Sequence, residues 1–261
     1  MHTKRTECGF RQTLRSIVHS IIGTSAAGVM IAIATAVLLL SIRTFNPTIQ
    51  HLLWQATGET LYMVGVAVVL AELIGLPLGI ILVVTEKGHV LANALINRIL
   101  GIVINIGRSV PFIILMVAII PFTRRVVGTS IGTTAAMVPL TVAAIPFVAR
   151  LVETALKEVD AGVVEAALAM GASPLQIICK VLIPEALPSL VLGFTITAVN
   201  LIGYSAMAGA VGGGGLGDLA VRYGYQRFRG DIMLLTVAVL IVLVQIMQSF
   251  GDWAAERLSK K

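Results

Sequence analysis

Charged residues are scarce in this sequence. Asp, Glu, Lys and Arg make up 12% of the 261 residues, hydrophobic residues make up 57%, and the mean hydropathy is +0.96. These values lie far outside the balance of a soluble domain and indicate an integral membrane protein. Because each spanning helix needs roughly 20 apolar residues, the length allows about five to seven spans and excludes an additional soluble catalytic domain.

Cysteine is almost absent. The topology derived below places both Cys8 and Cys179 in the cytoplasm, where disulfides are rare, and two isolated thiols do not make a metal site. The phosphate-binding pattern Gly-x-x-x-x-Gly-Lys-Ser/Thr is also missing, since the glycine-rich run at 212–217 is followed by Asp218 and not by Lys. We therefore expect no cofactor, no metal and no ATP bound by this chain.

Other functional patterns are missing as well. The sequence has no internal repeat of 20–50 residues and no inverted pair of interrupted apolar segments, which mark many secondary transporters. It has no clustered His, Cys or paired carboxylates within its apolar segments, so a membrane enzyme is disfavoured. The formal charge of +6 comes from basic residues scattered at the ends of apolar runs, which indicates membrane topology and not a nucleic-acid partner.

Six apolar stretches are long enough to cross a lipid bilayer as helices. They cover residues 17–42, 60–84, 99–122, 131–148, 187–210 and 232–250. The first exceeds the apolar core of about 7–15 residues in a secretory signal peptide, so we interpret it as a retained helix. The sequence thus predicts an all-α integral membrane protein with about six transmembrane helices.

Lys and Arg residues predict the orientation, because they accumulate on the cytoplasmic side of membrane proteins. With both termini inside, thirteen lie on the cytoplasmic side and six outside. The thirteen are Lys4, Arg5, Arg11, Arg15, Lys87, Arg98, Arg108, Arg150, Lys157, Lys180, Arg257, Lys260 and Lys261. The six are Arg43, Arg124, Arg125, Arg222, Arg227 and Arg229. We expect both termini, and the segment at 160–184, to lie in the cytoplasm.

This cytoplasmic segment, 160–184, contains signals for two short helices. Asp160 can cap a first helix, and Gly171 can end it in a left-handed conformation. Ser173 can cap a second helix, which we expect to stop at Pro184. Apolar residues on one side of the pair are Val164, Leu168, Ile177, Ile178 and Val181. By spacing alone, this side fits packing on the protein's own bundle as well as docking into a groove of a partner.

The same segment resembles the EAA loop of ATP-binding-cassette (ABC) importer permeases. The matching residues are Glu165, Ala166, Ala167, Gly171, Val181, Ile183 and Pro184. Three longer runs resemble the permease subunits of methionine ABC importers. They are 107–124 (GRSVPFIILMVAIIPFTR), 127–150 (VGTSIGTTAAMVPLTVAAIPFVAR) and 203–217 (GYSAMAGAVGGGGLG). The likeness runs from about Leu52 to the C-terminus.

The resemblance implies a division of the chain into three parts. Residues 51–255 would form the transmembrane domain of a type I ABC importer permease, with the coupling loop at 160–184. Residues 256–261 would be a basic cytoplasmic tail. Residues 1–50 would be a cytoplasmic segment and an additional transmembrane helix, because the family has five spans and this chain has six predicted ones.

The resemblance also implies a function and partners. The chain would be a permease without catalysis of its own in the bacterial inner membrane, working as a homodimer with two copies of a soluble ATPase that binds ATP and Mg. A methionine-binding lipoprotein would deliver L-methionine, and also D-methionine, from outside. Contacts to the ATPase would be Glu165, Ala166, Ala167, Gly171, Ile183 and Pro184. An importer permease for another small amino acid is one alternative, and an ion-coupled carrier without an ATPase is another.

Candidates for the transport path are two separate features. Met207 is a bulky, flexible residue among small neighbours, beside Tyr204 and Ser205, and would either close a narrow path or simply fill a gap. Glu72 is a lone acid in an apolar span, which costs roughly 2.5–3.5 kcal/mol at the membrane centre. It would either line the path or form a hydrogen bond within the bundle.

On the outer side, aromatic residues follow a glycine run. Tyr223, Tyr225 and Phe228 are candidate anchors for the binding protein. The glycines at 212–215 are expected to form a flexible loop or, alternatively, a turn that lets the binding protein come near.

Overall fold

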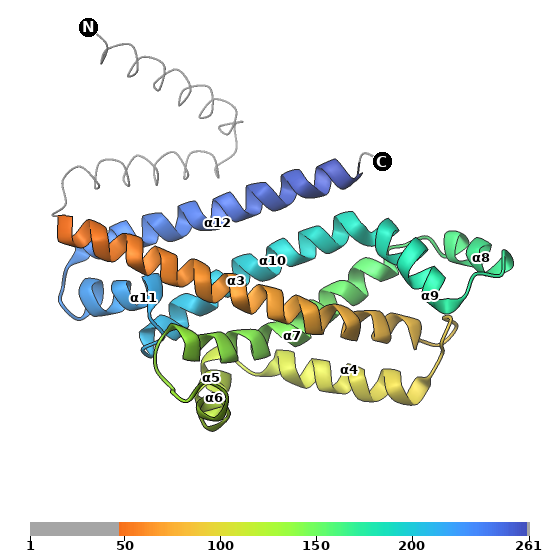
Figure 1. Cartoon of the computed structure of the whole chain (residues 1–261), viewed down its shortest axis with the longest axis horizontal. Helices are drawn as coiled ribbons and strands as arrows, with labels where there is room; N and C mark the ends of the chain where they lie inside the picture. The colour runs from red at the N-terminus through yellow and green to blue at the C-terminus, as the bar shows by residue number, and fades with distance from the viewer. Residues whose placement is uncertain (1–46, 260–261) are drawn as a thin grey trace, which may run out of the picture.

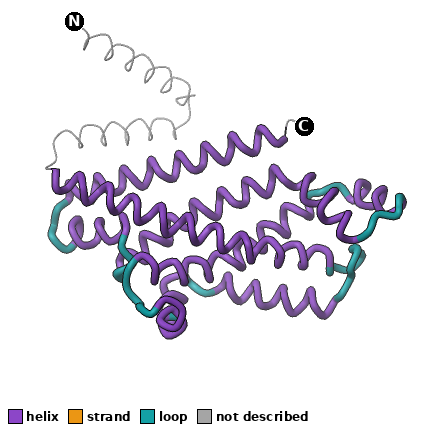
Figure 2. Tube along the Cα trace, viewed as in Figure 1, coloured by secondary structure: helices purple, strands orange, loops and turns teal. Residues whose placement is uncertain are grey.

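The computed structural model describes residues 47–259, and every regular element in this range is a helix (Figure 1, Figure 2). The first predicted span, 17–42, and the last two residues of the basic tail lie outside the described range. The helices that can cross a membrane are α3 (Pro47–Val84), α7 (Thr133–Lys157), the run Pro174–Ala210, and α12 (Gly230–Ser259). A fifth crossing is possible through the bent pair α4 (Ala94–Ser109) and α5 (Phe112–Ala118). The all-helical fold is therefore confirmed.

The third predicted span, 99–122, is wrong as a single helix. Helix α4 ends at Ser109, and α5 leaves it at an angle of 101° before α6 (Ile120–Val127) follows. Pro111 explains the break, because proline lacks an N–H and holds the preceding Val110 in an extended conformation with ψ 123°. Arg108 consequently lies in the last turn of α4, at the end of this helix away from the loop at 85–93.

Helices α3 and α7 form the centre of the bundle, and glycines allow their close approach. A Cβ at Gly75 would lie 2.7 Å from the Cβ of Val148, and one at Gly79 would lie 2.6 Å from the carbonyl oxygen of Ala149. Small residues at a helix interface permit contact between backbones, which stabilises helix pairs in membranes. Helix α10 (Ile183–Ala210) packs against α3, α7 and α12 and completes the main core.

The second coupling helix does not stop at Pro184. Helix α9 (Pro174–Ile177) continues through a π turn, η1 (Ile178–Leu182), into α10 as one run of 37 residues. In the π turn the N–H of Ile183 donates to the carbonyl oxygen of Ile178, five residues earlier. Our expectation was wrong because this wider turn shifts the hydrogen-bond register just before Pro184, which has no N–H to donate.

The short helices lie at opposite ends of the bundle. Helix α8 (Ala161–Ala169) and α9 occupy one end, while α11 (Gly215–Leu219), the π turn η2 (Ala220–Tyr225) and the start of α3 occupy the other (Figure 1). The segment resembling the EAA loop and the aromatic residues after the glycine run are thus separated by the full length of the spanning helices.

Candidate functional site

The turn between α8 and α9 is built by local hydrogen bonds. Asp160 begins α8, since its Oδ1 accepts the N–H of Gly162 at 2.6 Å. At the other end, the N–H of Gly171 donates to Leu168 and the N–H of Ala172 donates to Ala167, at 2.9 and 3.1 Å. With φ of 79° at Gly171, this is a Schellman motif. The predicted helix start and glycine terminus are confirmed.

The start of α9 is fixed just as closely. The backbone N–H of Ser173 donates to Oε1 of Gln176 at 2.8 Å, and the N–H of Gln176 donates to Oγ of Ser173 at 3.4 Å. This reciprocal capping box satisfies two backbone donors that the helix itself leaves unpaired. The predicted cap at Ser173 is confirmed, and the turn that joins α8 to α9 has a defined shape.

One side of this loop is anchored to the protein's own core. Ala167 and Ile177 are buried, and Val164, Ile178 and Val181 pack against the same cluster. Ile183 is half-buried at the start of α10. The anchored side accounts for most of the apolar residues that the sequence pattern grouped together, with the exception of Leu168.

The opposite side of the loop is exposed and apolar. Met170 has 82% of its surface exposed and Leu175 has 73%. We call the exposed apolar residues of this loop the docking surface: Val163, Leu168, Met170 and Leu175. The exposed candidates Glu165, Ala166, Gly171 and Pro184 lie on the same loop or directly after it. The loop therefore holds its shape from one side and leaves the other side available.

An ionic network supports the end of the bundle that carries α8 and α9. Nζ of Lys157 lies 2.8 Å from Glu86 and 3.1 Å from Glu153, and Arg150 lies 2.6 Å from Glu153. Arg150 also donates to Oδ1 of Asn105 at 2.5 Å. The network links α7 to α4 and to the loop after α3. From the sequence we interpreted Arg150 and Lys157 only as topology signals, although their spacing of three and four residues from Glu153 is typical of helix ion pairs.

At the opposite end of the bundle, the glycine run is held by two side chains of α3. Oε2 of Glu59 accepts the N–H of Gly215, and Oγ1 of Thr60 accepts the N–H of Leu216, each at 2.8 Å. A Cβ at Gly213 would lie 2.8 Å from the carbonyl oxygen of Ala208, so a larger residue does not fit. The chain packs closely there, as the alternative interpretation of this run as a turn would require. Glu59 and Thr60 were missed, since 156 residues separate each from its partner.

A polar pocket opens beside the glycine run. Its volume is about 400 Å³, and its lining includes Gln55, Glu59, Thr133, Asp218 and Arg222. Asp218 and Arg222 form an ion pair, and Gln55 donates to Glu59 at 3.0 Å. The polar groups of this pocket are therefore largely paired with one another.

The three aromatic candidates lie together after α11. Tyr223 is half-buried and has the guanidinium of Arg227 4.4 Å from its ring centroid, a cation–π arrangement. Tyr225 is 70% exposed and Phe228 is 91% exposed. Phe228 also has φ of 55°, which is unusual for a bulky residue, at the turn into α12.

The candidates for the path do not form one site. Met207 is 47% exposed, whereas Ser205 is buried and donates to the carbonyl oxygen of Ile202 at 2.7 Å. Tyr204 stacks on Phe112 of α5 with ring centroids 4.7 Å apart. Glu72 lines a separate groove between α3, α10 and α12, and none of the other three reaches it.

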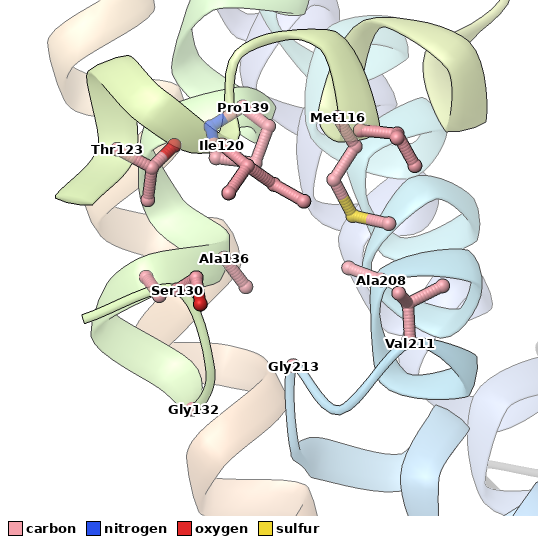
Figure 3. A pocket seen from close by; sticks show the side chains of 12 residues that line it. Met116, Ile120, Thr123, Ser130, Gly132, Ala136, Pro139, Ala208, Val211 and Gly213 are labelled. Atoms are coloured by element: carbon pink, nitrogen blue, oxygen red, sulfur yellow. The ribbon is translucent and has the colours of Figure 1, made fainter.

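A small pocket lies between α5, α6, α7 and the end of α10, and Met207 is not among its lining residues. Figure 3 shows Met116 extending toward Ala208 and Val211, with Ile120 and Ala136 across the space. Its cavity volume is about 40 Å³, enough for water but far below a drug-sized site of about 300 Å³. Within residues 47–259, no group of three or more His, Cys, Asp or Glu side chains could hold a metal.

Comparisons with known proteins agree with this arrangement. Residues 75–261 match the family model described as binding-protein-dependent transport system inner membrane component. The probable D-methionine transport system permease protein MetI of Vibrio cholerae is 61% identical over 210 residues, covering 80% of this chain and 93% of that protein. The methionine import system permease protein MetP of Bacillus subtilis is 46% identical over 209 residues, covering 80% and 94%.

A solved structure gives the same fold. A chain from the inward-facing conformations of the MetNI methionine ABC transporter superposes with a TM-score of 0.81 at 49% identity, and the match covers 82% of this chain and 99% of that one. Sequence, helix arrangement and the family model therefore agree over most of the described range. The chain belongs to the family of binding-protein-dependent transport system inner membrane components.

Proposed function

We propose that this chain is the permease subunit of a methionine ABC importer. It works as a homodimer with two copies of a soluble ATPase and an extracytoplasmic methionine-binding lipoprotein. The relatives named for methionine or D-methionine transport support this substrate, because 61% identity to one of them extends over 93% of its length. The chain performs no catalysis, and ATP and Mg are bound by the ATPase.

The docking surface is the observation that carries this proposal. Large side chains such as Met170 and Leu175 are exposed on a loop whose other side is already anchored in the core. Covering apolar surface is worth about 25 cal/mol per Å², so a partner with a matching groove gains binding energy there. Exposure of Glu165, Ala166 and Gly171 beside these residues fits a contact in which the ATPase grips the whole loop.

Transport follows from moving this loop between two positions. ATP draws the two ATPases together, the docked loops move with them, and the dimer changes from an inward-open to an outward-open arrangement. The bundle thus has two stable conformations, and the ATPase shifts the equilibrium between them. The free energy for this shift comes from the binding of ATP to the ATPase. In this chain, α9 receives the displacement and passes it into α10, which carries Tyr204 and Met207.

The segment from η2 into the start of α12 is the proposed contact for the binding protein. Tyr225 and Phe228 present exposed rings, and Tyr223 supports them from a half-buried position. Aromatic side chains are common anchors of protein interfaces. This assignment places α11 outside, α8 in the cytoplasm, and both termini on the cytoplasmic side of the bacterial inner membrane.

Uptake of labelled L-methionine tests the proposal. Cells lacking other methionine importers would express this chain with its ATPase and binding protein, and each component would be omitted in turn. We expect uptake to require all three and to be competed by methionine. Competition by a different amino acid instead would keep the importer and discard the substrate. Uptake that survives loss of the ATPase would overturn the importer and favour an ion-coupled carrier.

A further inference from the structure

A lengthwise groove separates α3 from α12. The two helices approach at their outer ends, where Ile49 and Leu53 share a core cluster with Ile232 and Leu235. Further inward both pack on α10, and a groove of about 450 Å³ lies between them. Its lining residues come only from α3, α10 and α12, and α4 and α5 lie toward α7 (Figure 1).

The lining of this groove contains one acid among apolar residues. Val68 and Glu72 come from α3, Phe194 from α10, and Met247 and Phe250 from α12. No side chain within residues 47–259 forms a hydrogen bond or ion pair with Glu72. An acid in an apolar membrane segment is costly without a partner, and such groups usually face protein or water.

We propose that the apolar stretch at 17–42 crosses the membrane as a helix seated in this groove. Only residues 43–46 separate this stretch from Pro47, and four residues span at most about 14 Å. The end of the helix is therefore held beside the outer end of α3. Helices α7, α10, α11 and α4 already occupy other sides of α3, which leaves the side that carries the groove.

The exposed stripe of α3 continues the groove toward its outer end. Leu61, Gly65, Val68 and Glu72 follow the spacing of four, three and four residues that places side chains on one helix face. Leu61 and Gly65 are exposed, and a Cβ at Gly65 would meet no atom within 4 Å. A helix of 26 residues is about 39 Å long, so it can run past this stripe, which is about 17 Å long from Leu61 to Glu72.

Antiparallel packing also gives Glu72 polar partners. Glu72 lies 25 residues after Pro47, about 38 Å along α3. Counting back from residue 42, and allowing up to about nine residues of slack for the linker, places residues 17–26 opposite Glu72. The polar residues in this range are His19, Ser20, Thr24 and Ser25. Each can donate a hydrogen bond to the carboxyl group.

The comparisons are consistent with a helix at 17–42 that packs on the outside of the bundle. The matched chain of the MetNI transporter is covered over 99% of its length by 82% of this chain, so a stretch about as long as residues 1–46 is additional to the shared fold. An added helix must therefore dock on the outside of a complete bundle. The groove between α3 and α12 offers that place without displacing a shared helix.

Disulfide cross-linking in the assembled complex tests this proposal. Cys8→Ser and Cys179→Ser would remove the native thiols, Val68→Cys would mark the groove, and one cysteine would be placed at each position from 21 to 30 in turn. We expect cross-links in the band of a single chain, recurring every three to four positions, identified by mass spectrometry of the joined peptides. Ile102→Cys, on the exposed face of α4, should form no cross-link with the same series.

Two results would overturn the proposal. Cross-links only between two chains would assign the groove to a second copy. No cross-link with Val68→Cys at any of the ten positions, while Thr85→Cys and Asn97→Cys do join, would show that the stretch lies elsewhere. The last pair is a suitable positive control because Nδ2 of Asn97 lies 3.3 Å from Oγ1 of Thr85. Neither result depends on the transported substrate.

Discussion

Gly171 offers a test that separates the shape of the docking loop from its contact with a partner. Its φ of 79° lies in the left-handed region, and a Cβ added there would meet no atom of the chain within 4 Å. Gly171→Ala should therefore cost only the backbone penalty of a left-handed residue, about 1–2 kcal/mol. This corresponds to a change of roughly 5- to 30-fold in the ratio of folded to unfolded protein.

Gly171→Leu pays a similar backbone penalty but also projects a bulky side chain from an exposed position. The proposed contact brings the ATPase against this position, so the leucine should prevent close approach. We expect the permease carrying Gly171→Ala to retain most of its ATPase during co-purification, and the one carrying Gly171→Leu to lose it. Thermal unfolding of both variants without the ATPase should give similar losses of stability.

A matched control comes from Gly128 at the end of α6. It also has positive φ, 81°, is exposed, and has no atom within 4 Å of an added Cβ. Helix α6 lies far from α8 along the bundle (Figure 1). Gly128→Leu should lower stability as Gly171→Leu does and still recover the ATPase. Normal ATPase recovery with Gly171→Leu would refute the docking assignment, and loss with both leucine variants would trace the effect to folding.

Three further changes test the outer end and the path. Glu59→Ala removes the acceptor for the N–H of Gly215, so the free energy of unfolding should fall by about 1–3 kcal/mol. Hydrogen exchange at the amide of Gly215 should become faster, and an unchanged exchange rate would contradict this prediction. Phe228→Ala with Tyr225→Ala should weaken binding-protein affinity about tenfold and leave ATPase recovery intact, which a pull-down and a binding titration can measure. Met207→Ala should let substrate leak or uncouple transport from ATP hydrolysis in vesicles, and unchanged coupling would dismiss Met207 as a gate.

Local features of the docking loop could be predicted from the sequence because each depends on neighbouring residues. Asp160 and Ser173 have side chains that cap a helix start, and Gly171 adopts a left-handed conformation at little cost. The structure shows all three in these places. Which apolar residues are anchored and which are exposed did not follow, since that depends on where α10 and α7 lie relative to α8.

Contacts between segments far apart in the chain could not be predicted from the sequence pattern. Glu59 and Thr60 lie in an apolar run with nothing nearby to indicate that they hold Gly215 and Leu216. The prediction of one straight helix over residues 99–122 was wrong for a different reason. Hydropathy over 99–122 stays high across Pro111, so an apolar count does not register a bend that comes from the proline's backbone.

The helix continues through Pro184, contrary to our prediction, and this affects how the two ends of the molecule are connected. A helix ending there would place a joint between the docking surface and the spanning helix, and a displacement of the loop would be lost in that joint. The continuous run Pro174–Ala210 is instead about 55 Å long, with Leu175 at the docking end and Met207 near the outer end. Because Tyr204 in the same helix stacks on Phe112, a rotation applied at α9 also reaches α5. The π turn at Ile178–Leu182 therefore keeps α9 and α10 in one continuous helical run through Pro184, where a proline break would separate them.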